Sequence, residues 1–156
     1  MSLAPVVLPP NEGQTIAIVG DKYRFLATGK ETDGLYTQID AVVYPGGGPP
    51  PHIHRREVEA FYILEGEITF LIDGEQLVAT AGMFANVPIG VVHTFRNNTD
   101  RPARMIVTIA PAGLEELFLA CGKPVSPDAD SVQPPTPEEI ETLMKLAPEY
   151  GVELIL

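Results

Sequence analysis

Residues 45–67 read PGGGPPPHIHRREVEAFYILEGE, an irregular loop followed by two histidines and a largely apolar run. The loop, residues 45–51, cannot form a helix or a strand, because its glycines loosen the backbone and its prolines lack an N–H donor. His52 and His54 follow it, two residues apart. Residues with this spacing on a strand point to the same face of a sheet, so the two imidazole rings project together.

The next run places an acidic side chain among apolar ones. Glu59 shares one face of the predicted strand with Phe61 and Ile63. A buried carboxylate without a partner costs several kcal/mol, so Glu59 requires a partner inside the protein. His93 alternates with apolar residues on a later strand. Three imidazoles and one carboxylate in an apolar setting suit a divalent transition metal ion.

Ordinary structural roles are the alternative for each of these residues. Glu59 could pair with Arg55 or Arg56, which follow the two histidines. His93 could be a hydrogen-bonded residue of the core or of the surface. Residue chemistry alone leaves both explanations open.

Short β-rich runs continue over residues 15–111 and are separated by turn residues. Glu65-Gly66 and Asp73-Gly74 are typical of tight hairpin turns, in which glycine takes up a positive φ. Many short strands at this spacing indicate an all-β barrel or sandwich. The predicted strands are residues 15–19, 23–27, 36–44, 58–64, 67–72, 76–80, 83–87, 91–96 and 104–109.

Residues 112–156 have a different pattern, which predicts two short helices. The first is indicated by apolar residues at helical spacing. Thr136 and Glu139 are spaced as a capping box with Pro137 at the first helical position, so the second helix begins there. Residues 152–156 are apolar enough to form a last strand. The residues that indicate the first helix are Leu114, Leu117, Phe118 and Cys121.

The composition excludes several classes of protein. A length of 156 residues fits one domain. The formal net charge of −11 disfavours nucleic acid and anionic membranes as partners. The single cysteine, Cys121, excludes an internal disulfide bond and a cysteine-rich zinc site. No basic segment precedes the short apolar run at residues 6–8, and no apolar run is long enough for a membrane span, so we expect a cytoplasmic protein.

The spacing of the glycines and of the ligand-type residues resembles the two sequence motifs of the cupin superfamily. At residue frequencies of about 5%, ten matches at fixed spacing have a chance probability on the order of 10⁻¹³ per starting point. The residues that fill the first motif are Gly46, His52, His54, Glu59 and Gly66. The residues that fill the second motif are Gly82, Pro88, Gly90, His93 and Asn97.

This resemblance implies a fold and a metal site. The fold is a conical β-barrel of the jelly-roll type, or double-stranded β-helix, over about residues 15–111. A helical extension at residues 112–156 completes a single domain. The site holds one divalent transition metal ion, which could be Fe, Mn, Ni, Co, Cu or Zn. Its implied ligands are His52, His54, Glu59 and His93.

Residues 45–67 and 146–156 are further similar to small single-domain cupins grouped with quercetin 2,3-dioxygenase. This resemblance implies a metal-dependent dioxygenase that acts with O₂ on a small aromatic or enolisable hydroxy compound. Glu59 would be the catalytic base, because a carboxylate ligand can take the proton of a substrate hydroxyl. The residues expected to line the substrate pocket, with ordinary barrel core as the alternative for each, are Phe61, Ile63, Met83 and Phe95.

Two other functions stay open. A sugar isomerase or epimerase would use the ion to polarise a carbonyl group. A phosphorylated sugar also needs basic residues near the pocket, whereas Arg55, Arg56 and Arg96 alternate away from the histidines. The third possibility is a non-catalytic cupin that binds or senses a small molecule.

A homodimer is the expected assembly. The outward strand faces carry Tyr62, Leu64 and Val92, and residues 154–156 form an apolar end. These surfaces suit a strand-swapped or sheet-packed dimer, which the family resemblance also implies.

Overall fold

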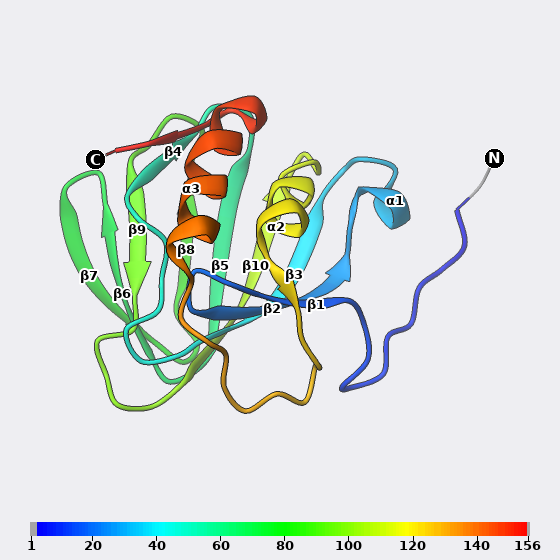
Figure 1. Ribbon diagram of the computed structural model, residues 1–156, viewed down its shortest axis with the longest axis horizontal. Coiled ribbons are helices and arrows are strands. Elements are labelled where there is room, and N and C mark those ends of the chain that lie inside the picture. Colours follow the sequence, from blue (N-terminus) through cyan, green and yellow to red (C-terminus); the bar gives the residue numbers. More distant parts are fainter. Residues whose placement is uncertain (1–2, 156) are drawn as a thin grey trace.

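The computed structural model describes residues 3–155, and two antiparallel sheets make up most of the protein (Figure 1). The strands of the first sheet are β1 (Thr15–Ile18), β2 (Asp21–Ala27), β3 (Thr37–Val43), β5 (Val58–Glu65), β8 (Phe84–Val87), β10 (Ala103–Ala110) and β11 (Lys123–Pro124). The strands of the second sheet are β4 (His52–His54), β6 (Glu67–Ile72), β7 (Glu75–Thr80), β9 (His93–Arg96) and β12 (Val152–Leu154). The helices are α1 (Gly29–Thr32), α2 (Glu115–Cys121), α3 (Pro137–Leu146) and the 3-10 helix η1 (Ala147–Tyr150).

The strand order confirms the predicted all-β jelly-roll barrel. Across the first sheet it is β11-β1-β2-β3-β10-β5-β8, and across the second it is β12-β4-β9-β6-β7. The hydrophobic core lies between the sheets, because alternate residues of each strand point inward. Phe61 of the first sheet and Phe70 of the second are both fully buried, with ring centroids 5.1 Å apart. Their contact joins the two layers of the barrel.

The C-terminal segment covers one side of the barrel. The predicted helices are confirmed as α2 and α3, which lie side by side in front of the sheets (Figure 1). The capping box is also present, since Thr136 and Glu139 exchange side-chain-to-backbone hydrogen bonds. The predicted last strand is β12, which pairs with β4 so that Val152 lies opposite His54. Leu156, at the end of that prediction, lies outside the described residues.

Three short elements, α1, β11 and η1, are not predicted by the sequence patterns. The loop expected over residues 29–34 contains α1, a single helical turn that is capped by Thr28 and Glu31. One turn is too short to show helical periodicity, so only its capping residues could have indicated it. Within residues 3–155, no helix combines the length and the apolar composition that a membrane span requires.

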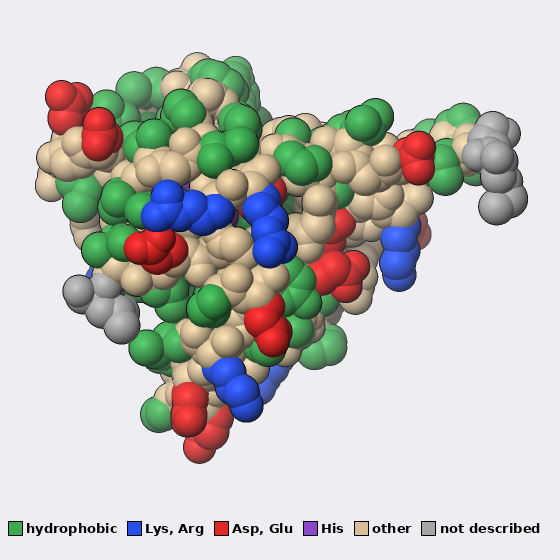
Figure 2. All heavy atoms as spheres, turned by 90° about the horizontal axis from the view of Figure 1, so that it is seen from above, with side chains coloured by type: hydrophobic (Ala, Val, Ile, Leu, Met, Phe, Trp, Pro, Cys, Tyr) green, Lys and Arg blue, Asp and Glu red, His purple; other side chains and the backbone are tan. Residues whose placement is uncertain are grey.

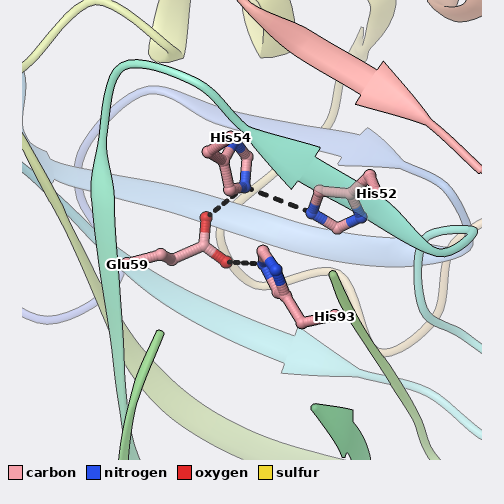
Figure 3. Close-up of side chains that lie close together, drawn as sticks. All are labelled: His52, His54, Glu59 and His93. Atoms are coloured by element: carbon pink, nitrogen blue, oxygen red, sulfur yellow. Dashed lines mark hydrogen bonds and ion pairs between the residues drawn. The ribbon is translucent and has the colours of Figure 1, made fainter. Parts of the chain in front are cut away.

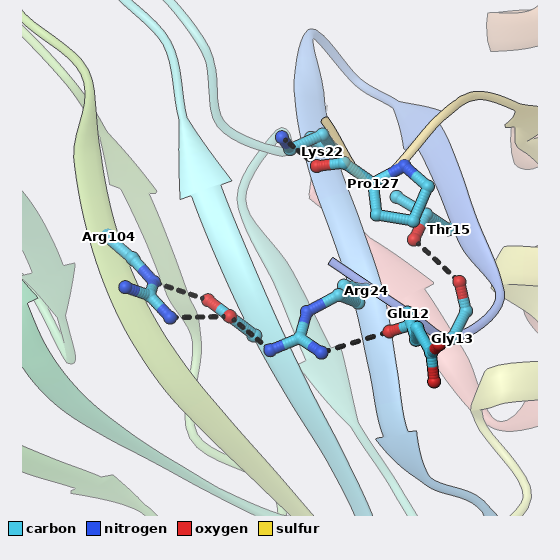
Figure 4. Close-up of polar contacts among 8 residues, drawn as sticks. Glu12, Gly13, Thr15, Lys22, Arg24, Arg104 and Pro127 are labelled. Carbon is cyan, nitrogen blue, oxygen red and sulfur yellow. Dashed lines mark hydrogen bonds and ion pairs between the residues drawn. The ribbon is translucent and has the colours of Figure 1, made fainter. Parts of the chain in front are cut away.

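Charged side chains on the outer face of the first sheet hold neighbouring segments together (Figure 4). Asp40 of β3 accepts two hydrogen bonds of 2.8 Å from Arg104 of β10 and one of 3.0 Å from Arg24 of β2. Lys22 donates a hydrogen bond of 2.8 Å to the carbonyl of Pro127, in the connector that leads to α3. These basic groups therefore stabilise the fold by linking neighbouring segments. They lie on the face of the sheet that points away from the barrel interior.

Asp21, at the start of β2, has a buried carboxyl group without a partner. Its exposed fraction is 0%, and neither of its oxygens hydrogen-bonds to a group within residues 3–155. Burial raises the pKa of Asp21 well above its usual value. Between the unfolded-state and the folded-state pKa, the folded protein binds more protons than the unfolded chain, so stability falls as the pH rises.

We therefore expect Asp21→Asn to increase the free energy of unfolding by more at about pH 8 than at about pH 5, because the amide, unlike the carboxylate, does not have to take up a proton when the chain folds. Urea unfolding of both proteins at the two pH values measures this difference. Asp100→Asn, at an exposed position, is the matched control and should change stability equally at both. A stability difference for Asp21→Asn that does not change with pH would contradict a raised pKa for Asp21.

Candidate metal centre

The four predicted ligand residues meet at one place inside the barrel (Figure 3). His52 and His54 come from β4, Glu59 from β5 and His93 from β9, so both sheets contribute. His52 lies directly opposite His93 in the pairing of β4 with β9. The exposed fractions of the four residues are only 1–6%. Figure 2, which views the protein from above Figure 1, shows almost no histidine surface.

The distances between the four side chains match the coordination sphere of one ion. Nε2 of His52 and Nε2 of His54 are 3.2 Å apart. Oε2 of Glu59 is 3.1 Å from Nε2 of His54, and Oε1 of Glu59 is 3.6 Å from Nε2 of His93. All four ligand atoms lie within 4.8 Å of one another. Ligand atoms at about 2.0–2.1 Å from a metal ion are about 3.0–3.4 Å from their neighbours, so the cluster has the size of such a site.

Backbone carbonyls orient two of the imidazole rings. Nδ1 of His52 lies 2.7 Å from the carbonyl oxygen of Pro50, and Nδ1 of His93 lies 3.0 Å from that of Val91. A carbonyl only accepts, so each Nδ1 carries the hydrogen and each Nε2 presents a lone pair to the centre. Nε2 of His93 is buried and has no hydrogen-bond partner within residues 3–155. A bound cation would satisfy this nitrogen.

The charges of Glu59 and His52 are those that a metal site requires. Burial alone would raise the pKa of Glu59, but its interactions with His54 and His93 outweigh burial and hold this pKa below its usual value. Burial would lower the pKa of His54, yet the neighbouring Glu59 carboxylate raises it. Burial and the nearby His93 lower the pKa of His52 to about 4. Glu59 is therefore an anion and His52 a neutral imidazole at neutral pH, the forms in which they bind metals.

The alternative partners of Glu59 are engaged elsewhere or lie outside the cluster. Arg55 is exposed and forms an ion pair with Glu153 of β12. Arg56 is exposed as well and packs against Gly151. The partners of Glu59 are the histidines, so the four residues form one polar group inside an apolar barrel.

A small cavity adjoins the cluster. Its volume is about 50 Å³, and its wall includes His52, His54 and Glu59. Phe61 and Phe95, two of the residues predicted for a substrate pocket, also line it. The C-terminal segment closes one side of the cavity with Phe118, Leu143 and Leu154.

The other two residues expected in the pocket do not line this cavity. Ile63 is buried in the core, but it lies four residues beyond Glu59 on β5, which is about 13 Å along a strand. Met83 also lies outside the wall of this cavity, and its side chain is 43% exposed. β8 begins only at Phe84, so the inward alternation of the strand does not extend to Met83. Instead, the Met83 sulfur accepts a hydrogen bond of 3.3 Å from the backbone N–H of Thr80.

The structure adds two polar residues that the sequence patterns do not single out. Tyr23 of β2 lines the cavity with the predicted ligands. Glu57 is 4% exposed, and one of its carboxylate oxygens has no partner within residues 3–155. The Nδ1 atom of His54 likewise lacks a partner in this range. The only sequence signal for Tyr23 is its inward position on a strand, which it shares with ordinary core residues.

Comparison with known proteins places these observations in a family. The family model of the cupin domain matches residues 40–109. Quercetin 2,3-dioxygenase from Bacillus subtilis strain 168 is 30% identical over 120 residues, which are 77% of this chain and 35% of that protein. The matched part of the chain thus spans about a third of the length of this curated relative.

Two solved structures share the fold. A predicted oxalate decarboxylase from Thermotoga maritima superposes with a TM-score of 0.63 at 19% identity, over 68% of this chain and 99% of that one. An RmlC-like cupin from Shewanella frigidimarina superposes with a TM-score of 0.63 at 23% identity, over 74% of this chain and 99% of that one. The two-sheet barrel and these matches show that the chain has the cupin fold and that residues 40–109 form a cupin domain.

Proposed function

We propose that His52, His54, Glu59 and His93 bind one divalent transition metal ion and that the protein is a dioxygenase for a compact hydroxy compound. The observation that carries this proposal is the convergence of three imidazole nitrogens and one carboxylate beside an apolar cavity. The resemblance to quercetin 2,3-dioxygenase supports the reaction class. Fe, Mn, Ni, Co, Cu and Zn all accept such a ligand set, and availability often decides among them.

The chain's own residues would handle the proton and exclude water. When bound, the ion supplies Lewis acidity, which lowers the pKa of a substrate hydroxyl. Glu59 would accept that proton, because its carboxylate is ionised at neutral pH and its two oxygens face different histidines. Phe61 and Phe95 would keep water from the oxidised substrate. In a dioxygenase reaction both atoms of O₂ enter the substrate, which supplies the electrons, so no further reductant is required.

The size of the cavity favours a compact substrate. Its volume of about 50 Å³ is far below the roughly 300 Å³ at the lower end of ordinary ligand pockets. A flavonol would require the wall formed by Leu143 and Leu154 to move aside. Compact catechols and enolisable hydroxyketones are therefore the better candidates.

A non-catalytic role in binding a small molecule is the second candidate function, and the same small apolar cavity favours it. The sugar isomerase receives less support, because the side chains that line the cavity within residues 3–155 include no lysine or arginine to hold a phosphate. Arg55, Arg56 and Arg96 are all exposed.

Metal analysis of protein purified without added metal, followed by O₂ uptake with catechols, hydroxyketones and flavonols, tests the proposal. The expected result is about one divalent ion per chain, together with O₂ uptake that depends on the substrate and is lost after chelation. Ligand binding without O₂ uptake would establish the non-catalytic role instead. A protein that cannot bind a divalent ion would overturn both the dioxygenase and the non-catalytic metal-dependent role.

We also propose a homodimer formed through the outer face of the first sheet. Tyr62 lies directly opposite Phe84 on one side and Ile106 on the other. Tyr62 and Phe84 are 46% and 64% exposed, which leaves an apolar strip uncovered. Light scattering should give twice the chain mass of 16.8 kDa, and a monomer at micromolar concentration would contradict this proposal. The cytoplasmic location expected from the sequence stays a prediction.

A further inference from the structure

Tyr23, whose side chain carries a phenol hydroxyl, lines the cavity that His52 and Glu59 also line. It lies on the inward face of β2 and is 7% exposed. In the sheet it is paired with Ile16 of β1 and Ala41 of β3. Two neighbouring strands therefore hold its backbone on both sides, so the position of Tyr23 does not depend on its hydroxyl group.

The ring of Tyr23 is also held by packing. It meets Phe118 of α2 edge to face, with ring centroids 5.4 Å apart. A phenylalanine at this position would keep the same ring and the same contact. The hydroxyl can thus be removed without removing the packing.

Among the side-chain hydrogen bonds within residues 3–155, none involves the hydroxyl of Tyr23, and this atom is not one of the fully buried polar atoms that lack a partner. A hydroxyl that has no protein partner and is not fully buried is available to a ligand. Burial, followed by the carboxylates of Asp21 and Glu59, raises the pKa of Tyr23 well above its usual value. The phenol therefore keeps its proton at neutral pH and can donate it in a hydrogen bond.

Outside the ligand cluster, the rest of the cavity wall is apolar. The other side chains that line it within the described part of the chain are aliphatic, aromatic or proline. Examples are Ile39, Phe61, Phe95 and Leu143. A bound molecule would thus meet polar side chains in two places, at the ligand cluster and at Tyr23.

We propose that Tyr23 donates a hydrogen bond to an oxygen atom of the ligand bound beside Glu59, and so selects compact oxygen ligands over nitrogen ligands. This inference rests on the proposed metal site. A hydroxy, enolate or hydroxamate oxygen can accept the hydrogen bond. Imidazole cannot, because its second nitrogen carries a hydrogen once the first nitrogen is bound.

Two probes of equal size test the proposal on cobalt-loaded protein. Acetohydroxamate presents oxygen atoms and imidazole presents nitrogen, and visible absorption of the cobalt reports the Kd of each. The variants are Tyr23→Phe and, as the matched control, Tyr36→Phe, whose side chain is 40% exposed and does not line the cavity. All three proteins should bind the same amount of cobalt. Only Tyr23→Phe should raise the Kd of acetohydroxamate, by about 10- to 100-fold, the range for one hydrogen bond to a charged group.

The Kd of imidazole should stay within about twofold in all three proteins, because this probe offers no acceptor to the phenol. An unchanged acetohydroxamate Kd in Tyr23→Phe overturns the inference. Equal weakening of both probes also overturns it, since that result indicates a damaged pocket. A wild-type protein that binds no cobalt overturns the inference and the proposed function together. If the Kd values follow the expected pattern but no substrate gives O₂ uptake, the proposed dioxygenase function is overturned and the role of Tyr23 is supported.

Discussion

His52→Ala combined with His54→Ala is expected to abolish metal binding. The double variant removes two of the four converging ligand atoms, so the loss of affinity should exceed the roughly 10- to 100-fold that follows the loss of an outer-shell partner. Equilibrium dialysis followed by elemental analysis measures the bound ion. We expect about one ion per chain in the wild-type protein and a value near zero in the variant.

Arg96→Ala is the matched control for this experiment. Arg96 lies on β9 with His93 but is exposed, so its loss should leave the metal content unchanged. Circular dichroism must show that the histidine variant is folded, because Glu59 loses one of its two buried partners. A folded double variant that retains the ion at the wild-type level would place the metal site elsewhere.

Phe61→Ala is expected to destabilise the protein by about 3–5 kcal/mol, as large-to-small substitutions of buried aromatic residues do. Phe61 is fully buried, and its ring lies 5.1 Å from that of Phe70 and 5.8 Å from that of Phe95. The ring of His93 is 6.5 Å away. The substitution therefore opens a cavity beneath the ligand cluster, and we expect weaker metal binding as well. Urea unfolding of the metal-free protein measures the stability separately from the ion.

Tyr36→Ala supplies the comparison, since it also removes an aromatic ring but from a side chain that is 40% exposed. Its cost should be clearly smaller than that of Phe61→Ala, because Tyr36 is already partly exposed whereas Phe61 is fully buried. Similar decreases in the free energy of unfolding for Phe61→Ala and Tyr36→Ala would contradict this prediction. They would show that the contact of Phe61 between the sheets stabilises the protein less than expected.

The barrel and the four converging residues could be predicted because the motif spacing that resembles the cupin superfamily is local in the sequence. His52 and His54 share a face by the two-residue period of a strand, and Glu59 follows on the next strand. The capping box of Thr136 and Glu139 is equally local, and it marks the start of α3 correctly. Met83 shows the limit of such rules, because alternation applies only where the strand has begun.

The sequence by itself determined the all-β class, the two C-terminal helices and the four residues that converge at the centre. Only the tertiary structure decided which distant segments surround that centre. The pairing of β12 with β4 joins distant residues such as His54 and Val152, and it brings Leu154 to the cavity wall. Tyr23 reaches the same wall through the order of strands in the first sheet. Strand order and sheet packing depend on which long-range contacts together bury the most apolar surface, and this property of the whole chain has no local signature.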